Sequence, residues 1–148
     1  MNTQWKAKSI THLEHADKDI NAKRAIKCTV IMRKKIKIEQ YSCELILIVT
    51  DKIKEDTNKI LKDANSKIKV DYEIEGIFLF HDIDKYYLLL STQHLTHNTI
   101  SHEVYHAVVR ITEDRDISDE ETQAWLMGYL IGTIYKYLET KKIKIKYA

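Results

Sequence analysis

The fold that we predict for this chain rests first on the stretch Gly76-Ile-Phe-Leu-Phe-His-Asp-Ile-Asp-Lys-Tyr-Tyr-Leu-Leu-Leu-Ser-Thr92. Its two apolar runs, 76–80 and 86–92, predict two strands, and the polar residues between them are few enough for a hairpin turn. A further apolar run at 45–49 shows no polar alternation, which is typical of a strand covered on both faces. These runs predict a small sheet in the middle of the chain.

Helical patterns lie on both sides of the hairpin. Thr50 can cap a helix that runs to about Ala64, with apolar residues on one face. Apolar periodicity predicts two more helices, at about 98–113 and 119–139. Upstream, alternation at 26–32 and 35–39 predicts half-buried strands, and the apolar spacing within 10–20 suggests a short amphipathic helix. The predicted fold class is α+β, with a small mixed sheet, one helix from the first half and a terminal helical pair.

Size and charge narrow the classes of function. The chain has 148 residues, 44% apolar and 31% charged, with a net charge of +2. This length suits one domain with a real core, and the near balance of charge gives no reason to propose nucleic-acid binding. Cys28 and Cys43 have no metal-ligand spacing. Without a secretory or membrane-spanning segment in the sequence, we expect a cytoplasmic protein with no membrane partner.

His102-Glu-Val-Tyr-His106 forms an H-E-x-x-H string inside the first of the two terminal helices. Residues four apart share a helix face, so the two imidazoles can be presented to one metal ion. Glu103 is offset by about 100°, which keeps it beside the metal, where a carboxylate can polarise a water molecule and accept its proton. The alternative is a chance match, with an ordinary glutamate between two solvated histidines.

A zinc site needs a third protein ligand, and the carboxylates at 119–121 begin the next helix. Three small residues recur every four positions in that helix: Ala124, Gly128 and Gly132. Such a stripe lets another helix approach closely. Glu121 lies on the stripe, whereas Glu120 is rotated about 100° away. If the stripe packs against the H-E-x-x-H helix, Glu121 points at the metal.

A competing interpretation exists for Glu121. Ser118-Asp-Glu-Glu121 also reads S-x-x-E, the capping box in which the glutamate pairs with backbone N–H groups. A capping glutamate is not available to zinc, so the two interpretations exclude each other, and the need for a third donor favours the ligand. His94 and His97, just before the helix, are further candidates, although solvated loop residues are the commoner case.

Together, the residues from His102 to Val109 and from Glu120 to Leu130 resemble the small zincin-like metallopeptidases of phages and prophages, which are minimal gluzincins. The likeness covers roughly residues 40–138. It implies a zincin-like domain at 40–148, with an active-site H-E-x-x-H helix and a C-terminal helix that bears the ligand glutamate. Residues 1–39 are then an N-terminal extension.

The resemblance also implies roles for individual residues. Glu121-Thr-Gln-Ala124 matches the Glu-x-x-Ala pattern of the third ligand, so His102, His106 and Glu121 would bind Zn²⁺ and Glu103 would be the general base. Larger gluzincins carry an acidic residue after that alanine to support a ligand histidine, and here the position is Trp125. The residue that stabilises the oxyanion is not assigned, although Tyr129 is available.

An edge strand along the cleft binds the extended substrate in that family. The run before the active helix, with Tyr86, Leu88 and Leu90, is the candidate here, and its backbone would bind a peptide without sequence specificity. Two functions follow as hypotheses. The first is a zinc peptidase acting on a peptide or protein substrate. The second is a weak or inactive zincin-shaped binding protein with structural zinc, which engages a phage or host protein.

Overall fold

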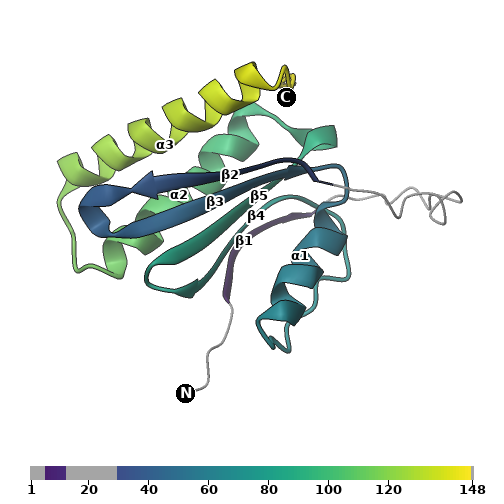
Figure 1. The fold of residues 1–148 in the computed structure, drawn as a ribbon, viewed down its shortest axis with the longest axis horizontal. Helices are drawn as coiled ribbons and strands as arrows, with labels where there is room; N and C mark the ends of the chain where they lie inside the picture. The colour runs from purple at the N-terminus through teal and green to yellow at the C-terminus, as the bar shows by residue number, and fades with distance from the viewer. Residues whose placement is uncertain (1–5, 13–29, 148) are drawn as a thin grey trace, which may run out of the picture.

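The computed structural model describes the fold of residues 6–12 and 30–147. The elements follow one another in the order β1 (Lys6–His12), β2 (Val30–Ile38), η2 (Glu39–Tyr41), β3 (Cys43–Thr50), α1 (Ile53–Asp63), β4 (Ile74–Asp82), β5 (Lys85–Ser91), η3 (Thr92–His94), α2 (His97–Glu113) and α3 (Glu120–Thr140). This is an α+β architecture, as the sequence predicts (Figure 1).

The strands form one mixed sheet in the order β1-β4-β5-β3-β2. β3 and β5 are parallel, with Leu47 opposite Leu88, while the other neighbouring pairs are antiparallel. The hairpin predicted between β4 and β5 is confirmed, with Gly76 opposite Leu90. β5 therefore lies in the middle of the sheet, and the edges are β1 and β2.

The prediction that β5 is an edge strand that binds substrate is wrong. Tyr86, Leu88 and Leu90 are fully buried, and the backbone of β5 pairs with β3 on one side and with β4 on the other. No row of backbone donors and acceptors is left for a peptide, so β5 is not an edge strand. The strand was predicted correctly, but its neighbours depend on long-range pairing that apolar runs do not encode.

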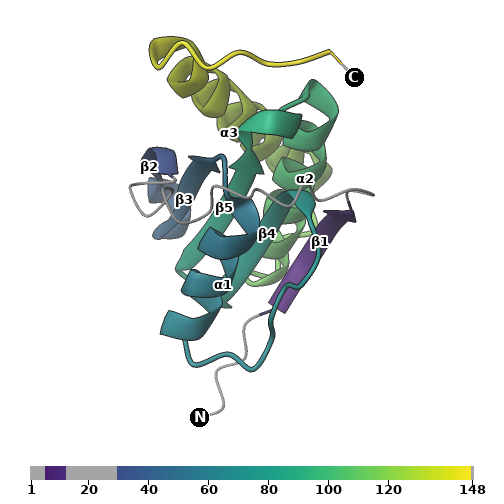
Figure 2. The same ribbon diagram turned by 90° about the vertical axis from the view of Figure 1, so that its right-hand side faces the viewer.

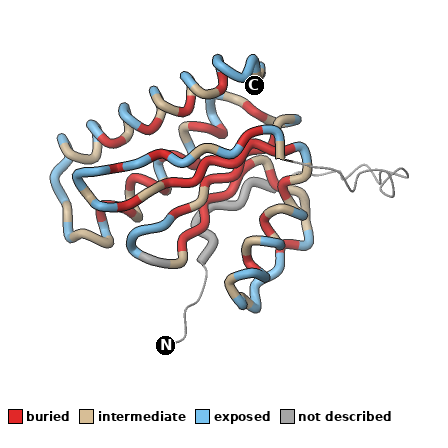
Figure 3. The backbone as a smooth tube through the Cα atoms, viewed as in Figure 1, coloured by how far each residue is buried: buried red, intermediate tan, exposed pale blue. Residues whose placement is uncertain are grey.

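Helices cover both faces of the sheet (Figures 1 and 2). The strand side chains alternate between two apolar clusters, one on each face. On β3, Leu45, Leu47 and Val49 face α2 and α3, whereas Ile46 and Ile48 face α1. The continuous apolar run at 45–49 is thus explained by burial on both sides, as predicted. Figure 3 shows this buried band along the central strands, with exposed positions on the outer side of α3.

The first part of the chain differs from its prediction. β2 is one continuous strand where two short runs were expected, and Ile10 belongs to strand β1, so the helix expected at 10–20 does not form at that end. The rest of that expected helix lies outside the described residues. Since β1 and β2 both join the sheet, the part of residues 1–39 that the structure describes is continuous with the predicted domain. In the described ranges, no helix is long and apolar enough to cross a bilayer.

Candidate metal centre

Helix α2 carries the H-E-x-x-H residues and begins at a well-defined cap. The side chain of Thr96 accepts a hydrogen bond from the backbone N–H of Thr99 at 3.0 Å, which satisfies one of the free donors of the first turn. Apolar residues at helical spacing then face the sheet: Ile100, Val104, Ala107, Val108 and Ile111. This buried stripe fixes the rotation of α2 and so decides where its polar residues point.

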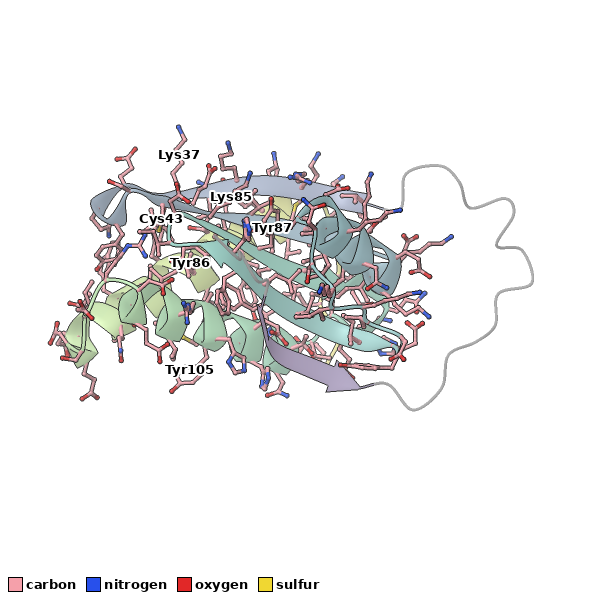
Figure 4. All side chains as sticks on the ribbon, turned by 90° about the horizontal axis from the view of Figure 1, so that it is seen from below. Lys37, Cys43, Lys85, Tyr86, Tyr87 and Tyr105 are labelled. Atoms are coloured by element: carbon pink, nitrogen blue, oxygen red, sulfur yellow. The ribbon has the colours of Figure 1, made fainter. Side chains whose placement is uncertain are left out.

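His102 and His106 lie together on the accessible side of α2. His102 is exposed, His106 is half-buried, and their ring centroids are 4.9 Å apart in an edge-on arrangement. Tyr105 beside them is 58% exposed and points away from the sheet (Figure 4). Two imidazoles one helical turn apart, with a path to solvent, fit two of the ligands of a zinc ion.

Glu103 points in a different direction from the two histidines. It is fully buried, and its side chain lies against the backbone of β4 at Gly76. A Cβ added at Gly76 would be 2.9 Å from Glu103 Cγ, closer than real Cβ contacts come, and 3.1 Å from Thr99 Cγ2, which is tighter than most of them. Glycine at position 76 therefore makes the space in which the carboxylate sits between helix and sheet.

A second carboxylate approaches the same end of α2. Thr99 is buried, and its hydroxyl lies 3.3 Å from Glu75 Oε2 and 3.0 Å from the hydroxyl of Thr96. Sequence reasoning missed Glu75, Gly76 and Thr99 as neighbours of the motif. Only the rarity of glycine, three in the whole chain, marks Gly76 out beforehand.

Glu121 does not join the two histidines. It stands in the first turn of α3, where it lines a cavity with Gln40, Tyr41, Thr122 and Trp125. Among residues 6–12 and 30–147, no three or more His, Cys, Asp or Glu side chains form a group that could hold a metal. The predicted ligand set is therefore incomplete: the histidine pair is present, and Glu121 is elsewhere.

The reason lies in the length of α2. The helix continues from His106 to Glu113, a rise of about 10 Å at 1.5 Å per residue, before the chain turns. The first turn of α3 consequently lies beside the end of α2, where Gln123 Nε2 donates to Thr112 Oγ1 at 3.4 Å. A residue level with His106 would have to come from further along α3.

The stripe argument for Glu121 also fails. Ala124, Gly128 and Gly132 are exposed, and a Cβ added at either glycine would meet nothing within 4 Å. The buried face of α3 is a different row: Leu126, Leu130, Ile134 and Leu138. Large apolar side chains remove more area from water than small ones, so they decide which face turns inward.

The capping box is corrected as well. Asp119, and not Ser118, is the cap of α3, and its carboxylate accepts from the Thr122 backbone N–H at 3.0 Å and from the Thr122 hydroxyl at 2.6 Å. These bonds, the side-chain one first, lower the pKa of Asp119 below its ordinary value. Glu121 is therefore neither a ligand beside the histidines nor the glutamate of a Ser118 capping box, and its side chain is exposed.

The remaining candidates make contacts of their own. His97 Nδ1 is hydrogen-bonded to the Tyr135 hydroxyl, and the two rings stack with centroids 5.5 Å apart. His94 lies in η3, before α2 begins. Tyr129 donates to the backbone carbonyl of Lys37 at 2.7 Å, which places it against β2.

The end of α2 is tied to the sheet by a partly buried polar network around Tyr86, one of the residues predicted to bind substrate. The Tyr86 hydroxyl lies 2.8 Å from Asp114 Oδ2 and accepts from Arg115 Nη1 at 2.9 Å. Burial raises the pKa of Tyr86 well above its ordinary value, and the Arg115 side chain opposes this shift. The network has a structural role, since it holds the last turn of α2 on β5.

Comparison with protein-family models, with curated proteins and with solved structures gives no match for this chain.

Proposed function

We propose that this chain is a zinc-dependent peptidase with a zincin-like arrangement, in which α2 is the active helix. The proposal is carried by the pair of imidazoles on the accessible side of α2, with ring centroids 4.9 Å apart and with Glu103 at the next position in the motif. The order of elements supports it, because the β4–β5 hairpin directly precedes the helix that bears H-E-x-x-H.

His102 and His106 would hold the zinc ion, and the third protein ligand is not Glu121. Bound there, zinc would act as a Lewis acid that activates water and polarises a peptide carbonyl. Glu103 would accept the proton from the attacking water and pass it to the leaving amine. Because Glu103 is fully buried against β4, this role requires its carboxylate to turn toward the side of α2 that carries His102.

The substrate would bind along β1 instead of β5. β1 is an edge of the sheet, pairs with β4 and lies against α2. An extended peptide that added to this edge would be held by main-chain hydrogen bonds and would run close to the active helix. Such binding would give affinity for unfolded or extended segments without a sequence preference.

The test is cleavage of an unfolded protein substrate, such as reduced and alkylated casein, by zinc-loaded protein. We expect Glu103→Gln to retain zinc and to lose at least about 100-fold in cleavage rate, the usual contribution of a general base. Glu121→Gln should keep both zinc and cleavage, because Glu121 lies elsewhere. Equal cleavage by the wild type and by Glu103→Gln would overturn the peptidase proposal.

The burial of Glu103 favours one alternative, a zincin-shaped binding protein that holds zinc without turning over a substrate. A carboxylate held between helix and sheet stabilises the packing of α2 and does not act on water. In that case the protein binds zinc through His102 and His106, no substrate is cleaved, and Glu103→Gln lowers stability with no effect on zinc affinity.

A further inference from the structure

The first turns of α3 and the η2 turn line a shallow cavity of about 310 Å³, open to solvent, that lies apart from the histidine pair. Its lining combines two aromatic side chains, a carboxylate, an amide and a hydroxyl: Tyr41, Trp125, Glu121, Gln40 and Thr122. This volume is at the lower end for small-ligand sites. Two residues that depart from the gluzincin pattern line this cavity. Glu121 does not join the histidine pair, and Trp125 stands where larger gluzincins have an acidic residue.

Trp125 is one of the residues that line this cavity. One face of its indole is covered by Tyr129, one turn further along α3, with ring planes within 4° and centroids 5.4 Å apart. Glu121 and Thr122, which line the cavity, lie one turn in the opposite direction. The indole is half exposed, so a ligand can reach the face that Tyr129 leaves open. An accessible indole face attracts cations through the quadrupole of the ring.

The charge around the cavity favours a cation. Three carboxylates stand at the cap and first turn of α3: Asp119, Glu120 and Glu121. Together they outweigh the roughly half positive charge of a helix N-terminus. The guanidinium of Arg115 does not line the cavity, and it is already engaged, because it donates to the Tyr41 carbonyl at 3.2 Å, to Tyr86 and to Ile83.

We propose that this cavity is a binding site for an organic cation, with the guanidinium group of an arginine side chain as its best ligand. A planar guanidinium can stack on the open face of Trp125 while its N–H groups donate to the Glu121 carboxylate in a forked pair. The Gln40 side-chain oxygen can accept a further bond. This site is independent of zinc and of the proposed peptidase activity.

The test uses N-acetyl-arginine methylamide as the probe and the isosteric, neutral N-acetyl-citrulline methylamide as its control. In a Trp5→Phe background, Trp125 is the only tryptophan, so its fluorescence reports on the cavity. We expect saturable quenching by the arginine probe and at least about tenfold weaker binding of the citrulline probe, since a charge-assisted hydrogen bond is worth about 1.5–3 kcal/mol.

Neighbouring glutamates provide the matched variants. Glu121→Gln should weaken binding of the arginine probe about tenfold, whereas Glu120→Gln, which removes the same charge next to the cavity, should change it less than about twofold. Both residues are exposed, so both variants should fold, which circular dichroism checks. Equal binding of the two probes, equal losses in the two variants, or no saturable quenching at all would each overturn the proposal.

Discussion

Gly76 is the residue that lets α2 lie on the sheet with a carboxylate between them. Glu103 and Thr99 occupy the space where any other residue at position 76 would place its Cβ. The other two glycines have open space around their Cα atoms. Gly76 is therefore required for steric reasons, whereas the two glycines of α3 only add conformational freedom to the unfolded chain.

We therefore expect Gly76→Ala to lower the free energy of unfolding by about 1–3 kcal/mol, the usual cost of overpacking. In a Glu103→Ala background the same change should cost less than about 1 kcal/mol, because the clashing Cγ is gone. Gly132→Ala is the control and should stabilise α3 by about 0.5–1 kcal/mol. Urea unfolding measures all four variants. A neutral Gly76→Ala would show that Glu103 does not sit as described.

Asp119 gives a pH-dependent prediction at the start of α3. Its bonds to Thr122 lower its pKa below the ordinary value of 3.8, so the ionised form stabilises the folded state. That stabilisation is present above about pH 4 and is lost as pH falls through the lowered pKa. Asp119→Ala should unfold at a lower temperature than the wild type at pH 7, and the difference should narrow as pH falls below about 4. A constant difference across this range would contradict the cap.

At the scale of elements, Tyr86 joins the middle strand to the end of α2. Tyr86→Phe leaves Asp114 and Arg115 without their hydroxyl partner and should cost about 1–3 kcal/mol. Because the pKa of Tyr86 is raised in the folded state, the wild type should also lose stability as pH rises above about 10, where the unfolded chain ionises. Tyr86→Phe should lose less over that range.

Tyr105→Phe is the control for this change. Tyr105 is 58% exposed on α2 and points to solvent, so its variant should stay within about 0.5 kcal/mol of the wild type at every pH. Unfolding in urea at pH 7, 9, 10 and 11 compares the three proteins. Equal losses for the two tyrosine variants would contradict a buried network at Tyr86.

The bounds of the helices were largely predictable from the sequence. Which face of each helix turns inward was harder to predict. α2 and α3 fall within a residue of their expected bounds, since apolar periodicity reports local structure. The inward face of α3 was predicted from its small residues and is instead its leucine and isoleucine row. A small-residue stripe allows close packing but supplies little apolar area, so burial of the larger side chains decides the rotation of the helix.

For the whole molecule, sequence spacing determined the histidine pair but not its surroundings. His102 and His106 are neighbours because the helix alone places them, four residues apart. Glu121 was predicted as a ligand from the small-residue stripe and from the family pattern, and β5 was predicted as the substrate strand from the resemblance alone. Both predictions depend on how far α2 extends before the chain turns and on which strands pair. Those are long-range properties that local sequence patterns do not encode. The close approach of Gly76 to Glu103 is one result of this long-range packing.

Zinc stoichiometry is the measurement that decides whether His102 and His106 form a zinc site on α2. Equilibrium dialysis at pH 7.5 followed by elemental analysis should give about one zinc per wild-type chain. His106→Ala should lose at least about 100-fold in zinc affinity, while His94→Ala, a histidine outside α2, should bind as the wild type does. Absence of bound zinc, or equal affinity of His106→Ala and the wild type, would contradict the account.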